Sequence, residues 1–293
     1  MFAKLSVHQL RDLLPFFTSH PKFALFANAV KFEIEKRLPN HPCDFYSYQK
    51  SEENAKYFYC FRHNRLPDSC RPILMIGSVQ TTVNGDDVIC GLEQIKNSEP
   101  EFENIILLVA STELAKLANK YLTTCCNIRE NYNVPCNNFY LPITVCPEIQ
   151  EKVDGITLPV SFSIGSTRLE DAEIVNSTWK FATPEDILQQ KEKIQRLPTA
   201  CIFHEEKPIA FEMIGLHGQL SHQYTMPGYR NRGFGAIIEN SIVSKCFREG
   251  ITPVKSVELS NEPVLKRSLE HPLWEIVKDE NGDKVIFDYI EYY

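Results

Sequence analysis

The apolar positions in the first half of the chain have helical spacing in some segments and strand spacing in others. Helices are predicted after the N-cap Ser6, between Pro21 and Pro39, over Val88–Lys96, and from the N-cap Thr112 to Tyr121. Strands are predicted at Lys56–Arg62, Pro72–Val79 and Ile105–Ala110, with a turn over Asn64–Cys70. This half therefore mixes helices with strands, and we find no ligand-binding motif in it.

The pattern weakens over Arg129–Pro159, where four prolines accompany few periodic apolar positions. Such a stretch is typical of a connection between domains, and 293 residues are enough for two domains of ordinary size. We therefore expect one domain over residues 1–150 and a second domain over residues 151–293.

The second half has a regular order of predicted elements. Two helices, Leu169–Phe181 and Pro184–Leu197 with Thr183 as N-cap, precede three strands at Thr199–His204, Ile209–Leu216 and Gln219–Met226. They are followed by a helix near Gly235–Arg248, a strand near Val254–Leu259 and a helix from Asn261 to Leu269. The last two strands, Trp274–Val277 and Lys284–Tyr289, are joined by a hairpin turn over Asn281–Asp283.

Composition and charge exclude several classes of protein. Apolar residues at 43% and charged residues at 24% are ordinary values for a globular chain. The net charge of −7 argues against a nucleic-acid partner, because proteins that bind nucleic acids neutralise phosphates with clustered lysines and arginines. No apolar run reaches the ~20 residues that cross a bilayer, so we expect a soluble protein with no membrane partner. Any anionic ligand has to be held by a local site.

Cysteines and the start of the chain bear on the compartment. Ten cysteines are too dilute for a disulfide scaffold, and their spacing gives no zinc-type cluster, so we expect free thiols, a reducing compartment and no metal. His8, Arg11 and Asp12 interrupt the apolar start, which argues against a secretory signal. Asp12 is the only acidic residue among the first 32, which gives a weak resemblance to a mitochondrial presequence.

The segment Gln223–Ala236, with the sequence QYTMPGYRNRGFGA, places a polar, glycine-rich turn between a predicted strand and a predicted helix. Main-chain N–H groups point outward at the start of a helix, and the helix dipole makes that end positive, so it binds phosphate well. Gly233 and Gly235 allow close approach to the main chain, and Arg230 and Arg232 add positive charge. The segment lacks the lysine of a Walker loop and the third glycine of a dinucleotide fingerprint.

The order R-x-x-G-x-G after a strand resembles the pyrophosphate loop of the GNAT superfamily of N-acetyltransferases. The predicted elements before and after the loop agree with that superfamily's plan. The resemblance implies acyl-CoA as a co-substrate, with no metal. It assigns the pyrophosphate to Arg230, Asn231, Arg232, Gly233, Phe234, Gly235 and Ala236.

Further residues resemble the glycine N-acyltransferase family, over about residues 165–277. They are Ile174-Val175-Asn176-x-x-Trp179-x-Phe181, Tyr224-Thr225-Met226-Pro227-x-Tyr229-Arg230, Ser260-Asn261-Glu262 and Pro272-Leu273-Trp274. The resemblance implies an α/β (α+β) fold of two acetyltransferase-type domains, each a mixed, mostly antiparallel sheet flanked by helices. Residues 1–150 would be the degenerate copy, and residues 151–293 the acyl-CoA-binding N-acyltransferase domain.

In the fold that the chain resembles, the strand before the loop separates from the next strand, and pantetheine lies in the gap. This implies that Tyr224, Thr225 and Met226 contact the pantetheine arm and the thioester, with a main-chain N–H stabilising the oxyanion. Asn261, at the head of the next helix, would bond the pantetheine amides. Simple N-capping by Asn261 is an equally open interpretation.

Catalysis needs a base, because an amino acid arrives as an ammonium ion. The glutamate proposed as base in the family falls on Gln219, whose neutral amide cannot accept the proton but can orient the amine or a water molecule. His217 and His222 are the candidate substitutes, since the pKa of imidazole, about 6.5, suits the work. Glu258 is a third candidate. The position of the leaving-group tyrosine in many members of the superfamily is Leu269.

The resulting hypothesis is an enzyme that transfers an acyl group from acyl-CoA to the amine of a small amino acid, glycine first. Two alternatives stay open. One is a catalytically impaired acyl-CoA-binding protein of the same fold, which the Gln219 departure favours, and the other is an acetyltransferase acting on a protein or polyamine amine. Members of the family are often mitochondrial, so we expect an intracellular, mitochondrial protein, with the cytoplasm as the alternative. The acyl chain and the oligomeric state are left open by the sequence.

Overall fold

The computed structural model describes residues 1–51, 56–66, 71–80, 82–179 and 182–293. They form two compact units. Unit 1 contains the described residues of Met1–Arg65, Cys70–Phe139 and Ser256–Tyr293, and unit 2 contains those of Leu66–Ser69 and Tyr140–Lys255. The C-terminal segment Ser256–Tyr293 therefore folds into the same compact unit as the N-terminal residues. The functional division at residue 150, into a degenerate half and an acyl-CoA-binding half, stays a prediction.

The same order of elements, β-α-α-β-β-β-α-β-α, occurs twice along the chain. The first series is β1 (Phe2–Lys4), α1 (Val7–Ser19), α2 (Ala24–Ile34), β2 (Cys43–Tyr48), β3 (Tyr57–Arg62), β4 (Ile73–Ser78), α3 (Gly85–Ser98), β5 (Leu107–Ser111) and α4 (Thr112–Cys125). The second is β7 (Phe162–Gly165), α6 (Ala172–Ser177), α7 (Ile187–Arg196), β8 (Thr199–His204), β9 (Lys207–Ile214), β10 (Leu220–Thr225), α8 (Phe234–Arg248), β11 (Val254–Glu258) and α9 (Glu262–Glu270). Between them lie β6 (Glu130–Tyr140) and α5 (Cys146–Asp154), and β12 (Glu275–Ile276) and β13 (Ile286–Tyr292) end the chain.

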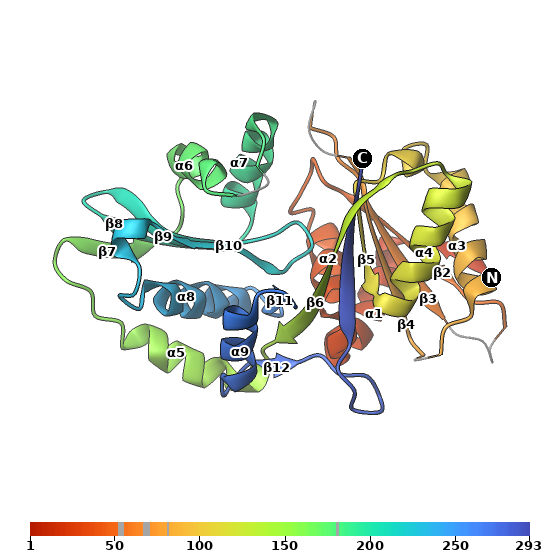
Figure 1. Cartoon of the computed structure of the whole chain (residues 1–293). Coiled ribbons are helices and arrows are strands. Elements are labelled where there is room, and N and C mark those ends of the chain that lie inside the picture. The colour runs from red at the N-terminus through yellow and green to blue at the C-terminus, as the bar shows by residue number, and fades with distance from the viewer. Residues whose placement is uncertain (52–55, 67–70, 81, 180–181) are drawn as a thin grey trace. The chain divides into compact units, whose positions relative to one another are not determined.

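The sheet of unit 1 has the strand order β1-β2-β3-β4-β5-β13-β6. All neighbouring pairs are antiparallel except β4 and β5. Figure 1 shows α1 and α2 on one face of this sheet and α3 and α4 on the other. Both faces are buried, and β3 shows it most clearly, because all six of its residues, Tyr57–Arg62, are buried. Apolar side chains on both sides of the strand therefore supply the core of this unit.

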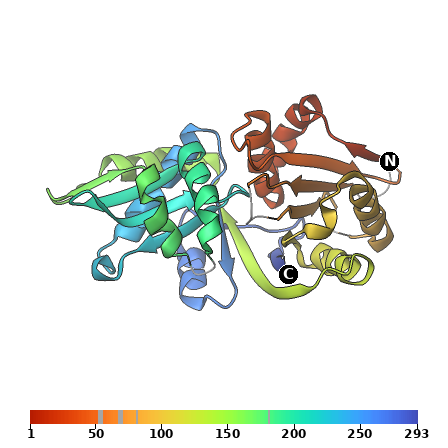
Figure 2. The ribbon, with the colours of Figure 1, turned by 90° about the horizontal axis from the view of Figure 1, so that it is seen from above.

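The sheet of unit 2 is built in the same way. β7, β8, β9 and β10 are antiparallel neighbours, and β10 then pairs in parallel with the start of β11 through Leu220 and Lys255. Figure 1 shows α6 and α7 on one face of these strands and α8 with α5 on the other. Figure 2, seen from above, has α6 and α7 in front of the strands. Each unit therefore has a mixed, mostly antiparallel sheet between helices, with one parallel pair.

Several local predictions are confirmed. Ser6 and Gln9 form a reciprocal capping box at the start of α1, and Thr183 forms one with Asp186 before α7. The three strands β8, β9 and β10 lie within two residues of their predicted bounds. Gly282, with a φ of +86°, lies in the predicted hairpin turn.

Other local predictions are wrong. Arg129–Pro159 is not simply a connection, because it contains β6 and α5. Pro135 lies within β6, opposite Asp288 of β13, and the prolines of this stretch concealed the strand pattern. Ser111, not Thr112, is the N-cap of α4. The helix predicted over Leu169–Phe181 is a 3₁₀ turn followed by the short α6, and its predicted end, Phe181, lies outside the described residues, as do residues 67–70 of the predicted turn.

Two further observations concern the helices and the cysteines. Within the described ranges, no helix is both long enough and apolar enough to cross a membrane. The cysteines of these ranges form no disulfide.

Candidate functional site

The loop between β10 and α8 has the geometry of an anion site. Gly233 is the N-cap of α8 and has a φ of +79°, in the left-handed region that favours glycine. As a glycine, this N-cap residue supplies no side-chain cap to the helix end. A Cβ atom built on Gly233 would meet nothing within 4 Å, so the space in front of the main chain is open. A group the size of a phosphate can therefore reach the main-chain N–H groups.

The first turn of α8 leaves N–H groups for such a ligand. The N–H groups of Ala236 and Ile237 donate to the carbonyl of Gly233, at 3.1 and 3.2 Å. The N–H groups before them have no partner inside the helix, as at any helix start. Asn231, Arg232 and Gly233 are exposed, whereas Phe234 is buried and anchors the start of the helix. The helix dipole adds positive character at this end.

Both arginines of the loop fold back onto it. Nε of Arg230 donates to the carbonyl of Thr225 at 3.0 Å, and its guanidinium lies 5.5 Å from the ring centre of Tyr224. Nη2 of Arg232 donates to the carbonyl of Gly228 at 3.1 Å, and its guanidinium lies 5.4 Å from the ring centre of Tyr229. These contacts leave further N–H donors on each guanidinium, so both arginines keep their charge at the loop and can donate to an anion.

The corresponding junction of unit 1, from β4 to α3, has the opposite character. The side chain of Asn84 caps α3 by accepting from the N–H groups of Asp86 and Asp87. Both aspartates lie in the first turn, where their charge opposes an anion. The two junctions therefore share a place in the fold but differ in charge, and only the β10–α8 loop suits a phosphate.

At the end of β10, the main chain is the part that a ligand could contact, because the side chains of Tyr224 and Met226 pack into the interior. Among the described residues, the register of β10 with β11 is limited to Leu220 and Lys255. Tyr224 and Met226 pack against an apolar cluster that includes Val175, Phe211 and Met213. The ring of Tyr224 stacks on Phe211 with centroids 5.9 Å apart. An extended ligand along this edge would therefore meet the backbone of β10 rather than those side chains.

Among the three candidate catalytic residues, Gln219 and His217 lie together. Nε2 of Gln219 is 3.5 Å from Nδ1 of His217, in the turn between β9 and β10. Oε1 of Gln219 is buried and accepts no hydrogen bond within the described part of the chain. A buried carbonyl oxygen without a donor is costly, so this oxygen is suited to an incoming N–H group.

His222 lies elsewhere, at a β-bulge. Between Ser221 and Tyr224, β10 has one more residue than β9 has between the partners of these two residues, and His222 has a φ of +56° there. Its Nε2 is 3.0 Å from Oγ1 of Thr178, and its ring meets Trp179 edge to face. Burial, and then the charge of Lys193, lower the pKa of His222 to about 4. His222 is therefore neutral at pH 7 and a weak proton acceptor.

Glu212 is a residue that the sequence analysis missed. It is 3% exposed, and its Oε2 accepts from Nε2 of Gln223 at 3.2 Å. The same Nε2 lies 3.3 Å from the carbonyl oxygen of Gly235, in the first turn of α8. Burial, and then the charge of Glu239, raise the pKa of Glu212 well above its usual range. Glu212 therefore positions Gln223 under the loop. A lone carboxylate in the apolar run Ile209–Leu216 was the available signal.

Asn261 and Glu258 belong to unit 1 and are described with it. Asn261 is the N-cap of α9, it is exposed, and its side chain makes no capping hydrogen bond. Leu269, in the same helix, is 45% exposed. The predicted part of Asn261 in binding pantetheine stays a prediction.

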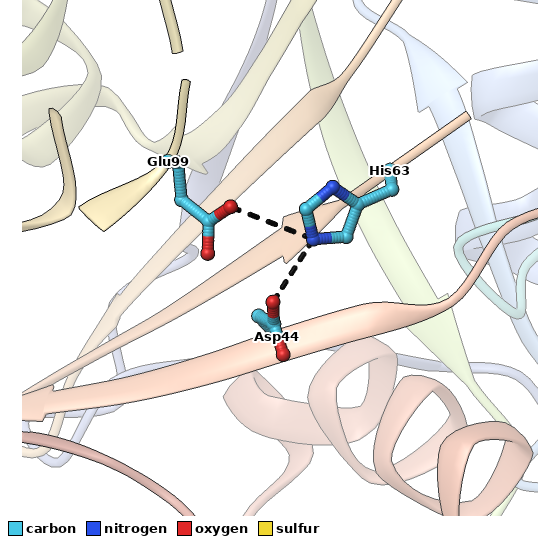
Figure 3. Close-up of side chains that lie close together, drawn as sticks. All are labelled: Asp44, His63 and Glu99. Carbon is cyan, nitrogen blue, oxygen red and sulfur yellow. Dashed lines mark hydrogen bonds and ion pairs between the residues drawn. The ribbon is translucent and has the colours of Figure 1, made fainter. Parts of the chain in front are cut away.

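Unit 1 contains a cluster with the spacing of metal ligands. Asp44, His63 and Glu99 place one ligand atom each within 4.8 Å of one another (Figure 3). Nζ of Lys4 lies 2.7 Å from Oδ2 of Asp44, and the hydroxyl of Tyr46 donates to Glu99. Burial would raise the pKa of Asp44, but hydrogen bonds from His63 and Lys4 outweigh it and hold the pKa at about 2. The hydrogen bond with Asp44 raises the pKa of His63. Both carboxylates thus have partners already, and we interpret the cluster as an ion-pair network.

Solved structures define the fold class. A Drosophila protein aligns with a TM-score of 0.70 at 15% identity, covering 100% of this chain and 98% of that one. A tandem GNAT protein from the clavulanic acid biosynthesis pathway aligns with a TM-score of 0.51 at 10% identity, covering 100% and 98%. The predicted fold class, two acetyltransferase-type domains of mixed α and β structure, is confirmed.

Sequence similarity is narrower. No protein-family model matches the chain. The chain is similar to glycine N-acyltransferase of Homo sapiens, with 29% identity over 114 residues, and to that of Pongo abelii, with 28% over 114 residues. Each match covers 38% of this chain and 38% of the relative, so it spans well under two thirds of either protein. The resemblance found in the motifs is confirmed as a similarity to glycine N-acyltransferase.

The lowered pKa of His222 predicts a pH-dependent stability. Between pH 6.5 and pH 4 the unfolded chain takes up the proton first, so stability falls as the pH falls, by up to about 3 kcal/mol. We expect His222→Asn, which tolerates the positive φ and does not titrate there, to lose most of this fall. Urea unfolding at about pH 7.5 and about pH 5 measures it.

Thr178→Val is the matched control, since it removes the hydrogen bond and keeps the histidine. It should lower stability at both pH values and retain the fall. If the free energy of unfolding falls equally with pH in His222→Asn and in the wild type, His222 is not the group responsible.

Proposed function

We propose that unit 2 binds an acyl-CoA and that the protein transfers the acyl group to the amine of a small amino acid, glycine first. The observation that carries the proposal is the uncapped start of α8 behind Gly233, with two arginines in the same loop. The similarity to glycine N-acyltransferase over 114 residues supports the acceptor. The partners are therefore an acyl-CoA and a small amine, and a mitochondrial location stays a prediction.

Each part of coenzyme A has a matching feature. The pyrophosphate would accept hydrogen bonds from the N–H groups at the start of α8 and from the guanidinium groups of Arg230 and Arg232. The pantetheine arm would run along the main chain of Tyr224, Thr225 and Met226, because among the described residues β10 pairs with β11 only through Leu220. This arrangement would place the thioester toward the turn that contains Gln219.

The reaction is a direct transfer. The amine nitrogen, after losing a proton, attacks the thioester carbon, and the carbonyl oxygen becomes an oxyanion that a main-chain N–H of β10 would stabilise. The C–S bond then breaks, the amide forms, and coenzyme A leaves as a thiolate or takes a proton from water. Leu269 has no proton to give at the position where many relatives of this fold have a tyrosine.

His217 is the proton acceptor that we propose. It lies beside Gln219, whose amide N–H donates to Nδ1 of His217 at 3.5 Å. Nδ1 would exchange this long hydrogen bond for the proton of the substrate amine, while Oε1 of Gln219 would accept another N–H of the amine. His222 is less suited, because its pKa of about 4 makes it a weak base and its Nε2 is already bonded to Thr178. Gln219 is thus an orienting residue in this proposal.

A second candidate function is acyl-CoA binding without efficient transfer. The neutral amide of Gln219, in the place where the glutamate of the resembled family falls, favours it. The loop geometry would serve both functions equally, so only turnover separates them.

Loss of either loop arginine should weaken coenzyme A binding. We expect Arg230→Gln and Arg232→Gln each to raise the Kd about tenfold or more, since a hydrogen bond to a charged group contributes about 1.5–3 kcal/mol. Calorimetric titration measures the effect, with pantetheine, which lacks the pyrophosphate, as the ligand that should be unaffected.

Arg248→Gln, at the other end of α8, is the charge-matched control and should leave the Kd unchanged. If the wild type and the three variants bind coenzyme A with equal Kd, the loop arginines do not take part in binding and this part of the proposal is wrong.

Turnover tests the chemistry. We expect the wild type to release coenzyme A from benzoyl-CoA or acetyl-CoA when glycine is added, and His217→Asn to lower kcat about a hundredfold with little change in the KM for acyl-CoA. Gln219→Glu should raise the rate, because it supplies a second proton acceptor.

A wild type that binds acyl-CoA and turns over no amine, together with activity in Gln219→Glu, would establish the binding protein instead. If coenzyme A is released when a polyamine or a peptide is added, but not when any amino acid is added, the acceptor is that amine and the proposed amino-acid acceptor is wrong.

A further inference from the structure

Unit 1 has a pocket of about 330 Å³ at the carboxyl ends of its two parallel strands, β4 and β5. Helix α2, the start of α4 and the hairpin before β13 complete its walls. Ligands commonly bind outside the carboxyl ends of parallel strands. Most of the inner wall is apolar, and it includes Phe23, Phe26, Met75, Val109 and Phe287.

The pocket lies beside the β4–α3 junction of unit 1, which corresponds to the β10–α8 junction of unit 2. In both series of elements, a strand, a helix and a second strand parallel to the first follow one another. Unit 1 differs at the helix start, because Asn84 caps α3 and Asp86 and Asp87 follow. The junction beside the pocket therefore opposes a phosphate, and we infer that the ligand of this pocket is not a coenzyme A.

The pocket lining carries three carboxylates and two amines, and three of these five groups already have partners within the chain. Lys22 is paired with Glu280 and also donates to the carbonyl of Val79 at 2.7 Å. Asp279 accepts from the N–H groups of residues 281 and 283, both at 2.9 Å. Lys284 and Glu113, one of each sign, are the other charged residues of the lining, and both are exposed. Burying a charged ligand against the apolar wall would cost free energy, because three of the five charged groups already have partners and the other two are exposed.

One polar feature faces the apolar wall. The lining includes Ser78, Ser111 and Thr112, and Ser111 is the N-cap of α4 but makes no side-chain capping hydrogen bond. The hydroxyls of Ser78 and Thr112 already donate to the carbonyls of Gln80 and Ile286, at 2.8 and 3.4 Å. The hydroxyl of Ser111 and the first N–H groups of α4 would therefore be the donors to one oxygen atom of a ligand.

We propose that this pocket is a second ligand site, which takes an uncharged, mostly apolar small molecule with one hydrogen-bonding group. Its volume is at the small end of the range of about 300–1,000 Å³ for ligand pockets, which suits a single ring or a short chain. The site is independent of the proposed acyl-CoA site, because its walls come from unit 1 alone.

The four methionines of the chain supply a reporter that needs no mutation. Met75 lines the pocket, whereas Met213 and Met226 lie in the cluster behind the β10 strand of unit 2, and Met1 is exposed. With methyl-¹³C-methionine in the full chain, benzyl alcohol should shift the Met75 signal in a saturable way and leave Met1 and Met213 unmoved. Benzoate and benzylamine, which have the same ring and opposite charges, should bind about tenfold more weakly.

Val109→Phe tests the location, because Val109 is the direct neighbour of Met75 in the β4–β5 register and its new ring would fill the pocket. It should abolish the benzyl alcohol shift. Leu107→Phe is the control, since Leu107 lies two residues earlier on the same strand and does not line the pocket, so it should keep the shift.

Coenzyme A serves as the second ligand of the experiment. Coenzyme A should shift the methyl signal of Met226 and leave that of Met75 unchanged. Bound benzyl alcohol should not alter the Kd of coenzyme A. Failure of coenzyme A to bind would overturn the proposed function and leave this pocket untouched. An unmoved Met75 at every benzyl alcohol concentration, a benzoate or benzylamine that binds more tightly than the alcohol, or a shift that survives in a folded Val109→Phe would each overturn the second site.

Discussion

The start of helix α8 is the constraint on which the account of unit 2 depends. A helix always leaves its first N–H groups without partners inside the helix. Here the N-cap residue is Gly233, which supplies no side-chain acceptor and keeps the space in front of these N–H groups open. The side-chain amide of Gln223 donates to the carbonyl of Gly235 in the first turn of this helix, and it also donates to Glu212, which positions it. The rest of the proposed site is arranged around an anion that would complete these hydrogen bonds.

The two units show how one order of elements can acquire two chemistries. Both have a strand, a helix and a parallel strand at the corresponding place. In unit 1 an asparagine cap and two aspartates satisfy and neutralise the helix start. In unit 2 the helix start is uncapped and two arginines lie beside it. A few residues at one junction thus decide which copy can hold a phosphate, while the sheets and their helices are alike.

Much of this could be predicted from the sequence, because periodicity and caps are local. The three strands before the loop, the capping boxes and the glycine-rich segment are all encoded within a few neighbouring residues. Pairing over long distances is not, so the placement of β13 between β5 and β6 had no signal in its own residues. Pro135 concealed β6, because proline is uncommon inside strands.

The catalytic candidates show the same division. Strand alternation does not reveal the bulge at which His222 meets Thr178, nor the burial that lowers the pKa of His222. The approach of His217 to Gln219 depends on how the turn between β9 and β10 folds, which residue types alone do not specify. Glu212 looked like one more charged residue, and its burial comes from packing against α8 and the neighbouring strand.

The central claim, that main-chain N–H groups of the β10–α8 loop hold the pyrophosphate, is tested most directly by amide hydrogen exchange with and without coenzyme A. The account predicts slower exchange over Met226–Ile237 when coenzyme A is bound, and no such change over the β4–α3 junction of unit 1. Protection confined to unit 1, or bound coenzyme A with unchanged exchange over Met226–Ile237, would contradict it.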